Sequence, residues 1–324
     1  MRKSGRKLVS AALTAAMALS LAACGGQAAD ATTAAETTTE AASQEETTAQ
    51  ETTEEETQAE EPADNQQADI VVIGAGGAGM TAAIQAVQDG ATDVVILEKM
   101  PVTGGNTTRS TGGLNAAGTS YQEADGVEDS VELFVEDTMK GGKELNDKEL
   151  VTVMAENSAG AVDWVNEIGG DLSVVGMFGG ASVKRIHRPT DTSAVGPMLV
   201  KALNAKTEEL GIPVLLETTA EKILVDDSGK VCGVTGTDKD GQEFTIDCTA
   251  VVLATGGFGA NSDMVVEYKP DLAGFCTTNH AGATGDGIAM AKELGAAFVD
   301  MEQIQTHPTV NPDTQTMYTE GVRG

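Results

Sequence analysis

One stretch of the chain, residues 68–98, constrains the fold more than any other. An apolar run (69–73) leads into the glycine turn GAGGAG (74–79), an alanine-rich segment follows, and a second apolar run (93–97) ends at Glu98. Strand, glycine turn, helix, strand and acid, in this order, are the fingerprint of a dinucleotide-binding βαβ unit. The stretch therefore predicts an α/β fold built around a Rossmann-like domain.

Each glycine of this turn has an expected role. Gly74 makes the tight turn, Gly76 lets the backbone approach a pyrophosphate, and Gly79 lets the helix lie close to the strand. The pyrophosphate then meets the unpaired N–H groups at the positive end of the helix, and Glu98 accepts hydrogen bonds from a ribose diol. The alternative is an ordinary glycine-rich turn, and an acid about 20 residues further on argues against it.

The N-terminus has the pattern of a signal peptide. Basic residues within positions 2–7 precede an apolar run from Leu8 to Leu19, too short for a membrane span, and the segment ends Leu-Ala-Ala-Cys. This ending resembles a bacterial lipoprotein signal, with residues 1–23 as signal peptide and a lipid on Cys24. We expect lipid anchoring at the extracytoplasmic face of a bacterial cell membrane. An ordinary secretory signal with a chance cysteine is the alternative.

Residues 24–67 have the composition of a disordered tether. Positions 30–64 carry twelve acidic residues and no basic ones, and they hold no aromatic or long aliphatic side chain. Such a segment cannot bury enough apolar surface to fold, and its like charges extend it. The net charge of −30 argues against nucleic acid as a partner.

Cysteine usage indicates an organic cofactor. Apart from Cys24 the chain has only Cys232, Cys248 and Cys276, and it has no Cys-x-x-Cys pair. This is not a disulfide framework, and it offers no c-type haem attachment and no zinc or iron–sulfur site. We therefore expect no metal site.

The rest of the body alternates predicted helices and strands. The predicted helices are residues 130–140, 147–168, 196–210 and 288–294. The predicted strands are residues 213–216, 221–225, 231–237, 243–247 and a buried strand that begins at Ala250. The strands from 221 to 247, around turns at 226–229 and 238–241, form a β-meander inserted into the α/β domain.

Glycine-rich stretches elsewhere are candidate cofactor contacts. Residues 101–117 are mostly small, which suits a loop packed against a flat ring and a second phosphate, although a flexible surface loop is the alternative. The strand end at 254–257 offers backbone to a cofactor, and residues 282–287 open a helix with free N–H groups. Basic residues within 184–188 either reach a phosphate or carboxylate or belong to a polar loop.

Several motifs follow one another along the chain. They are GAGGAG (74–79) with Glu98, GGN (104–106), GGLNAA (112–117), GGAS (179–182), ATGGF (254–258), GDG (285–287), THPT (306–309) and TEGVRG (319–324). This ordered set resembles the FAD-binding part of the fumarate reductase/succinate dehydrogenase flavoprotein superfamily. Within it, the motifs are most similar to flavocytochrome c fumarate reductases and urocanate reductases. The resemblance covers residues 68–324 and implies FAD as the cofactor.

The resemblance implies which positions contact FAD. Ala78 and Glu98 match residues that hold its AMP half, and Ala220 matches a backbone contact to adenine. The other expected cofactor residues are Gly74, Gly76, Gly79, Gly105, Asn106, Thr107, Thr111, Gly112, Gly256 and Asp286.

A substrate site is implied as well. Its expected members are Gly112, His307, Thr319 and Glu320, and Glu320 with Arg323 forms a catalytic relay that passes a proton. The implied reaction is FAD-dependent reduction of the C=C bond of an α,β-unsaturated carboxylate, such as fumarate or urocanate, by hydride transfer from flavin N5. The other two histidines of the chain, His187 and His280, are expected to be structural.

The resemblance divides the body into an FAD-binding domain, residues 68–301, and the start of a substrate-capping domain, residues 302–324. The haem domain of the family has no counterpart here, so the electron donor is unidentified. The proton-donating arginine and the last FAD-contacting segment of the family lie beyond Gly324. A truncated chain, inactive by itself, is therefore expected.

Two other classes of protein stay open. One is another FAD enzyme of the superfamily, such as a ketosteroid dehydrogenase or an aspartate oxidase. His307 together with the TEGVRG motif favours the carboxylate reductase over it. The other is a solute-binding lipoprotein, which shares the signal, tether and body but not the glycine fingerprint.

Overall fold

The computed structural model describes residues 66–307, 310–311 and 313–314. The predicted signal peptide, nearly all of the predicted tether and the TEGVRG motif lie outside these residues. Within the described part, no helix is both long enough and apolar enough to cross a membrane.

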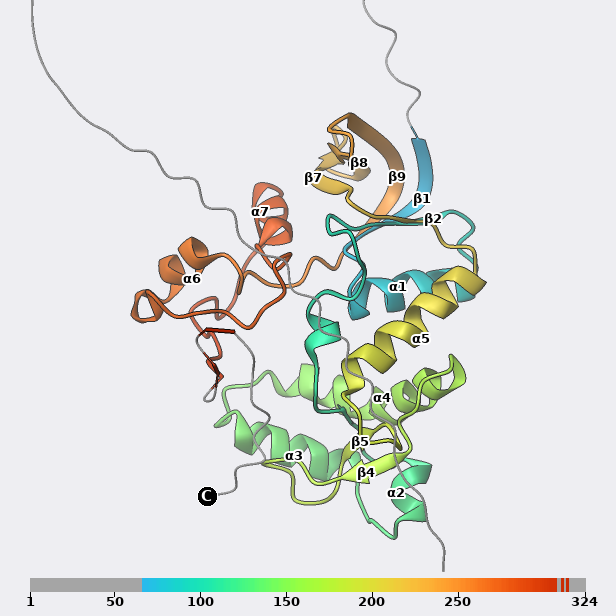
Figure 1. Ribbon diagram of the computed structural model, residues 1–324, viewed down its shortest axis with the longest axis vertical. Coiled ribbons are helices and arrows are strands. Elements are labelled where there is room, and N and C mark those ends of the chain that lie inside the picture. The colour runs from blue at the N-terminus through green and yellow to red at the C-terminus, as the bar shows by residue number, and fades with distance from the viewer. Residues whose placement is uncertain (1–65, 308–309, 312, 315–324) are drawn as a thin grey trace, which may run out of the picture. The chain divides into compact units, whose positions relative to one another are not determined.

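A six-stranded sheet forms the centre of the fold, with the order β6-β2-β1-β9-β8-β7. Its strands are β1 (Gln66–Ile73), β2 (Val94–Leu97), β6 (Val214–Leu215), β7 (Thr219–Val225), β8 (Val231–Thr237) and β9 (Glu243–Leu253). The pairs β6·β2, β2·β1 and β1·β9 are parallel, whereas β9·β8 and β8·β7 are antiparallel. Figure 1 shows β1 between β2 and β9, so the predicted α/β fold is confirmed.

The β-meander differs from the prediction in one respect. Residues 243–247 and the strand predicted from Ala250 form a single strand, β9, of 11 residues. β9 pairs with β8 from Glu243 to Asp247 and with β1 from Ile246 to Leu253. Pairing with β8 on one edge and then with β1 on the other keeps the strand continuous past its polar residues Asp247 and Thr249, which the sequence pattern could not show. The predicted turns are confirmed by hydrogen bonds from Asp226 N–H to the Lys230 carbonyl and from Asp238 N–H to the Gln242 carbonyl.

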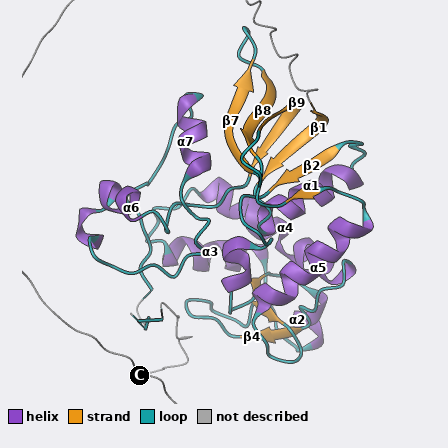
Figure 2. Ribbon diagram, turned by 45° about the horizontal axis from the view of Figure 1, so that its top comes forward, coloured by secondary structure: helices purple, strands orange, loops and turns teal. Residues whose placement is uncertain are grey.

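Two helices pack against one face of the sheet. They are α1 (Gly77–Gln88) and α5 (Val195–Glu209), which lie side by side below the sheet in Figures 1 and 2. Met80 and Ile84 of α1 and Leu203 of α5 are buried in one cluster with Val72 and Ile96 of the sheet. Because the central strands are covered here, their side chains form the apolar runs seen in the sequence.

The other face of the sheet, including the part formed by the meander strands, is covered by α7 (Asp286–Glu293). Val71 and Ile73 of β1 are buried with Val234 of β8, Ile246 of β9 and Met290 of α7. Burial of Met290 holds α7 against this face, so the N-terminus of α7 lies close to the ends of the parallel strands.

A helical region follows the first βαβ unit. It contains α2 (Ser120–Ala124), α3 (Val131–Gly141), α4 (Lys148–Glu167) and a small sheet of β3 (Leu114–Asn115), β5 (Ile186–Arg188) and β4 (Val174–Gly176). The side chain of Ser130 caps α3 and that of Asp147 caps α4, which accounts for where both predicted helices begin. The remaining elements are α6 (Ser262–Tyr268) and two 3₁₀ helices, η1 (Gly105–Arg109) and η2 (Pro270–Leu272). Residues 101–117, expected to be a loop, therefore include η1 and β3.

Candidate cofactor site

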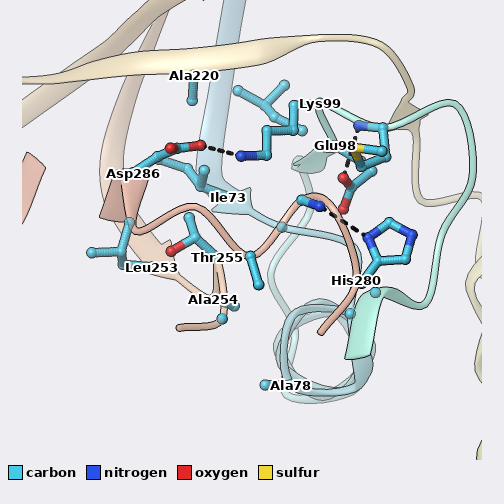
Figure 3. A pocket seen from close by; sticks show the side chains of 18 of the residues that line it. Ile73, Ala78, Glu98, Lys99, Ala220, Leu253, Ala254, Thr255, His280 and Asp286 are labelled. Carbon is cyan, nitrogen blue, oxygen red and sulfur yellow. Dashed lines mark hydrogen bonds and ion pairs between the residues drawn. The ribbon is translucent and has the colours of Figure 1, made fainter. Parts of the chain in front are cut away.

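A cavity of about 390 Å³ lies where β1, β2 and β9 end and where α1 and α7 begin. Figure 3 shows Ile73, Leu253 and Ala254 from the strand ends beside Ala78 of α1 and Asp286 of α7. Ligands of open α/β sheets bind at the carboxyl ends of the parallel strands. Ten of the expected cofactor residues line the cavity: Gly74, Gly76, Ala78, Glu98, Gly105, Asn106, Thr107, Ala220, Gly256 and Asp286.

The glycine turn has the geometry expected of it. Gly74 has a φ of +107°, and a Cβ atom on it would lie 2.4 Å from the carbonyl oxygen of Ala254. A Cβ atom on Gly79 would lie 1.8 Å from the carbonyl oxygen of Gly74. Gly76 is different, because a Cβ there would meet only the Gly104 carbonyl oxygen, at 3.9 Å. Gly74 and Gly79 are therefore required by the protein's own packing, whereas Gly76 leaves open space along the cavity.

The N-terminus of α1 is suited to an anion. Its N-cap, Gly76, provides no side-chain cap, and the first turn contains no acidic residue. The N–H of Gly77 donates to Oγ1 of Thr107 at 3.0 Å. The cavity is lined by Gly76, Gly77 and Ala78, so the positive end of the helix dipole faces it.

Glu98 points back towards the glycine turn. Its Oε2 accepts a hydrogen bond from the N–H of Ala75 at 2.8 Å, and its Oε1 accepts one from the N–H of Met100 at 2.9 Å. The side chain is buried, yet it lines the cavity. Each carboxylate oxygen keeps a lone pair beyond these bonds, and a ribose hydroxyl can donate to it.

The stretch after Gly104 is tied to residues far along the chain. The N–H of Gly104 donates to the carbonyl oxygen of Ala75 at 2.8 Å. The Asn106 side chain donates to Oδ1 of Asn279 at 2.7 Å and accepts from the N–H of His280 at 2.6 Å. Asn106, expected to contact the cofactor, thus also holds the segment around His280 beside the glycine turn.

Sequence reasoning missed several residues of this cavity. Lys99 and Met100 line it directly after Glu98, and their place at the end of β2 was the available signal. His280 also lines it, and its Nδ1 accepts a hydrogen bond from the N–H of Gly282. His280 was expected to be structural, and its place in the cavity was not predicted. No local sequence pattern connects it with Asn106, which lies more than 170 positions earlier and contacts its backbone.

The expected substrate residues do not gather in one place within the described residues. His307 lines a second cavity, of about 330 Å³, with Thr277 and Thr306. Gly112 is half-buried, and a Cβ on it would face Ile186 at 3.5 Å, while Thr111 is exposed in a shallow cavity with Asn106. Thr319, Glu320 and Arg323 lie outside the described residues. Their roles, and that of His307, stay predictions.

Two of the residues in the basic segment 184–188, Arg185 and His187, belong to a buried structural network. Arg185 is buried and bonded to Asp129 and Asp137, so the alternative that it reaches a phosphate is wrong. His187 is fully buried between the Arg185 carbonyl oxygen and Oγ1 of Thr119, as expected of a structural histidine. Across residues 66–307, and in the short described pieces after them, no group of three or more His, Cys, Asp or Glu side chains is placed to hold a metal.

Comparison with known proteins identifies relatives of this fold and site. The sequence profile of the FAD binding domain family matches residues 69–324. The chain is 46% identical over 256 residues to an NADH:fumarate oxidoreductase of Klebsiella pneumoniae, covering 79% of this chain and 28% of the relative. It is 39% identical over 253 residues to a urocanate reductase of Eggerthella lenta, covering 76% of this chain and 41% of the relative.

A solved structure is similar as well. The open conformation of a flavocytochrome c3 fumarate reductase superposes with a TM-score of 0.76 at 41% identity, covering 78% of this chain and 45% of that chain. The chain thus spans less than half the length of each of these relatives.

Proposed function

The chain belongs to the FAD binding domain family and uses FAD as its cofactor, and from this premise we propose that it forms the FAD-binding part of a reductase. The proposed reaction is reduction of the C=C bond of an α,β-unsaturated carboxylate, with fumarate or urocanate as the expected substrate class. Relatives named as an NADH:fumarate oxidoreductase, a urocanate reductase and a flavocytochrome c3 fumarate reductase support this choice.

The residues around the larger cavity fit FAD. The open side of Gly76 and the N-terminus of α1, whose N-cap residue has no side chain, would hold the diphosphate, and Glu98 would hold the adjacent ribose. Ala220 lines the same cavity and would contact adenine. When bound, FAD supplies the hydride, from N5 of its reduced ring, to one alkene carbon.

The protein has to orient the substrate and deliver a proton. His307, Thr319 and the backbone at Gly112 would hold the conjugated carboxylate and stabilise the charge that builds on it. Glu320 would feed a proton to Arg323, because an arginine holds its own proton tightly and needs a carboxylate neighbour to exchange it. These assignments rest on the match of positions within the family motifs.

Support for the proposal comes chiefly from one feature: the cavity that joins the glycine turn, the start of α1 and the buried carboxylate of Glu98. The test uses the protein isolated from its own organism. It should carry flavin absorption, and its flavin, reduced by a viologen dye, should be reoxidised by fumarate, urocanate or acrylate but not by a 3-ketosteroid. Reoxidation by the steroid alone, or by none of these compounds, would overturn the proposal.

His307→Ala is the matched test of the substrate site. Flavin content should stay unchanged while reoxidation by the unsaturated acid falls by about a hundredfold or more. Equal loss of flavin and activity would assign His307 a structural role instead.

We also propose that a lipid on Cys24 anchors the protein to the extracytoplasmic face of the cell membrane, on the evidence of the N-terminal sequence. Cys24→Ser should move the protein from the membrane fraction to the soluble fraction. Unchanged partitioning would refute lipidation. The electron donor of this reductase remains to be identified with the same preparation, by testing NADH and quinols.

A further inference from the structure

Lys99 links two sides of the cofactor cavity. Its ammonium group donates hydrogen bonds to Oδ2 of Asp286 and to Oγ1 of Thr284, residues that follow it by 187 and 185 positions. Lys99 comes directly after Glu98 at the end of β2, and Asp286 is the first residue of α7. Figure 3 shows the Lys99–Asp286 pair inside the cavity, next to Ala220. We call Lys99, Thr284 and Asp286 the Lys99 clasp.

The donors and acceptors of the clasp are matched. Lys99 donates to both partners, and the Thr284 hydroxyl gives its one hydrogen to Oδ1 of Asp286 at 2.7 Å. Burial opposes ionisation of Asp286, but the hydrogen bonds from Lys99 and Thr284 outweigh it and hold the pKa of that carboxyl below 3.8. Asp286 is therefore a carboxylate at neutral pH.

The charges around the cavity require a cation. Glu98 and Asp286 are the two carboxylates among the residues that line it, and Lys99 is the one Lys or Arg side chain among them. A diphosphate in the same cavity adds further negative charge. Without Lys99, like charges would face one another in a partly desolvated space, where their repulsion is poorly screened.

We propose that Lys99 is a positioning residue for FAD, acting through Asp286 on the AMP half of the cofactor. Lys99 holds the start of α7 against the end of β2. Its positive charge offsets the negative charges of Glu98 and Asp286 in the part of the cavity between Glu98 and Ala220. The side chains of Lys99 and Asp286 are 25% and 37% exposed, so the clasp is more shielded than a surface ion pair. The inference rests on FAD binding, as the proposed function does, and is independent of the substrate.

The test measures affinity of the full-length apoprotein for FAD and for ADP, by flavin fluorescence and by calorimetry. Lys99→Met should raise both dissociation constants by about ten- to a hundredfold, the usual effect of losing charge-assisted hydrogen bonds. Asp286→Asn in the Lys99→Met background should add little, because the two residues act as one unit. Lys99→Arg, which keeps the charge, should recover part of the loss.

Lys292→Met is the matched control, since Lys292 is an exposed lysine on the same helix, α7, and does not line the cavity. It should leave both dissociation constants unchanged. The proposal would be overturned by Lys99→Met binding FAD and ADP like the natural protein. Weaker FAD binding with unchanged ADP binding would overturn it too, as would additive effects of the two substitutions. If the natural apoprotein does not bind FAD either, the result contradicts the proposed FAD-binding function rather than the role of Lys99.

Discussion

Oε2 of Glu98 lies 2.8 Å from the backbone nitrogen of Ala75, and this hydrogen bond joins the end of β2 to the glycine turn. The second oxygen of the same carboxylate accepts from the N–H of Met100. Glu98 thus has two tasks in the proposed site: it shapes the turn from the inside, and it offers its remaining lone pairs to a ribose.

Replacing Glu98 by glutamine tests both tasks. An amide has one acceptor oxygen, so its NH₂ group would face either the N–H of Ala75 or that of Met100. FAD affinity should fall about ten- to a hundredfold, the range expected when charge-assisted hydrogen bonds are lost. Equilibrium titration of the apoprotein with FAD measures this. Glu293→Gln, at the exposed end of α7, is the control and should bind FAD normally.

Gly79→Ala should destabilise the domain. The added Cβ would lie 1.8 Å from the carbonyl oxygen of Gly74, which is backbone and has little room to move. We expect a loss of at least about 1–3 kcal/mol in the free energy of unfolding. Chemical denaturation measures it. Gly160→Ala, inside α4 with no atom within 4 Å of its Cβ, should instead stabilise the protein by about 1 kcal/mol. Equal effects of the two substitutions would contradict this account of the turn.

Arg185→Met should be among the most damaging changes outside the cavity. Nε and Nη2 of Arg185 bind the two oxygens of Asp129 at 2.9 and 2.7 Å, and Nη1 binds Asp137 at 2.8 Å. Because the Asp129 side chain is 0% exposed, it would be left as a buried charge without a counter-ion, held only by the hydrogen bonds from Gln122 and from the N–H of Ser130. The expected loss is about 3–5 kcal/mol of unfolding free energy.

Two further variants test whether the stability loss comes from losing the ion pair between Arg185 and Asp129. Arg185→Lys cannot reproduce the two-pronged bond to Asp129, so it should recover only part of the loss. Lys239→Ala, which removes an exposed pair with Asp240, should leave stability nearly unchanged, because solvent screens an exposed ion pair. A mild effect of Arg185→Met would show that the hydrogen bonds from Gln122 and Ser130 are enough to stabilise the Asp129 carboxylate.

His187 should make stability depend on pH. Burial lowers the pKa of His187 below its ordinary value of 6.5, although backbone hydrogen bonds and the charges of Asp163 and Asp129 oppose the shift. Between the lowered pKa and 6.5 the unfolded chain binds more protons than the folded one. Stability therefore rises with pH in this window, is level above it, and falls as the pH drops below 6.5.

Denaturation between about pH 5 and pH 8 checks this, with a slope of up to about 1.4 kcal/mol per pH unit for one group. The difference between the natural protein and His187→Gln isolates His187 from the other two histidines. The partly buried carboxylate Asp137, whose desolvation is outweighed by hydrogen bonds from Ser182 and Arg185 that lower its pKa, loses its contribution only at much lower pH. A variant with the same slope as the natural protein would exclude His187 as the source.

The sequence predicted those parts of the fold whose causes are local. The apolar run of β1, the close approach of Gly79 to Gly74, the starts of α3 and α4 and the turns of the meander each depend on residues a few positions apart. Periodicity and turn chemistry report such short-range causes directly. Where a strand continued through polar residues, as in β9, the partner strands decided the outcome and the local pattern was misleading.

By itself the sequence determined that this chain builds a dinucleotide-binding turn. The glycine turn, the start of the helix and the acid after the second strand all lie within one short stretch of sequence. Only the tertiary structure decided which distant side chains complete it. Lys99 reaches Asp286, Asn106 meets His280, and Arg185 is withdrawn into a buried network away from the cavity. The physical reason is the strand order: once β9 pairs beside β1, the segments that follow β9 are carried to the ends of β1 and β2. No pattern within either segment contains that information.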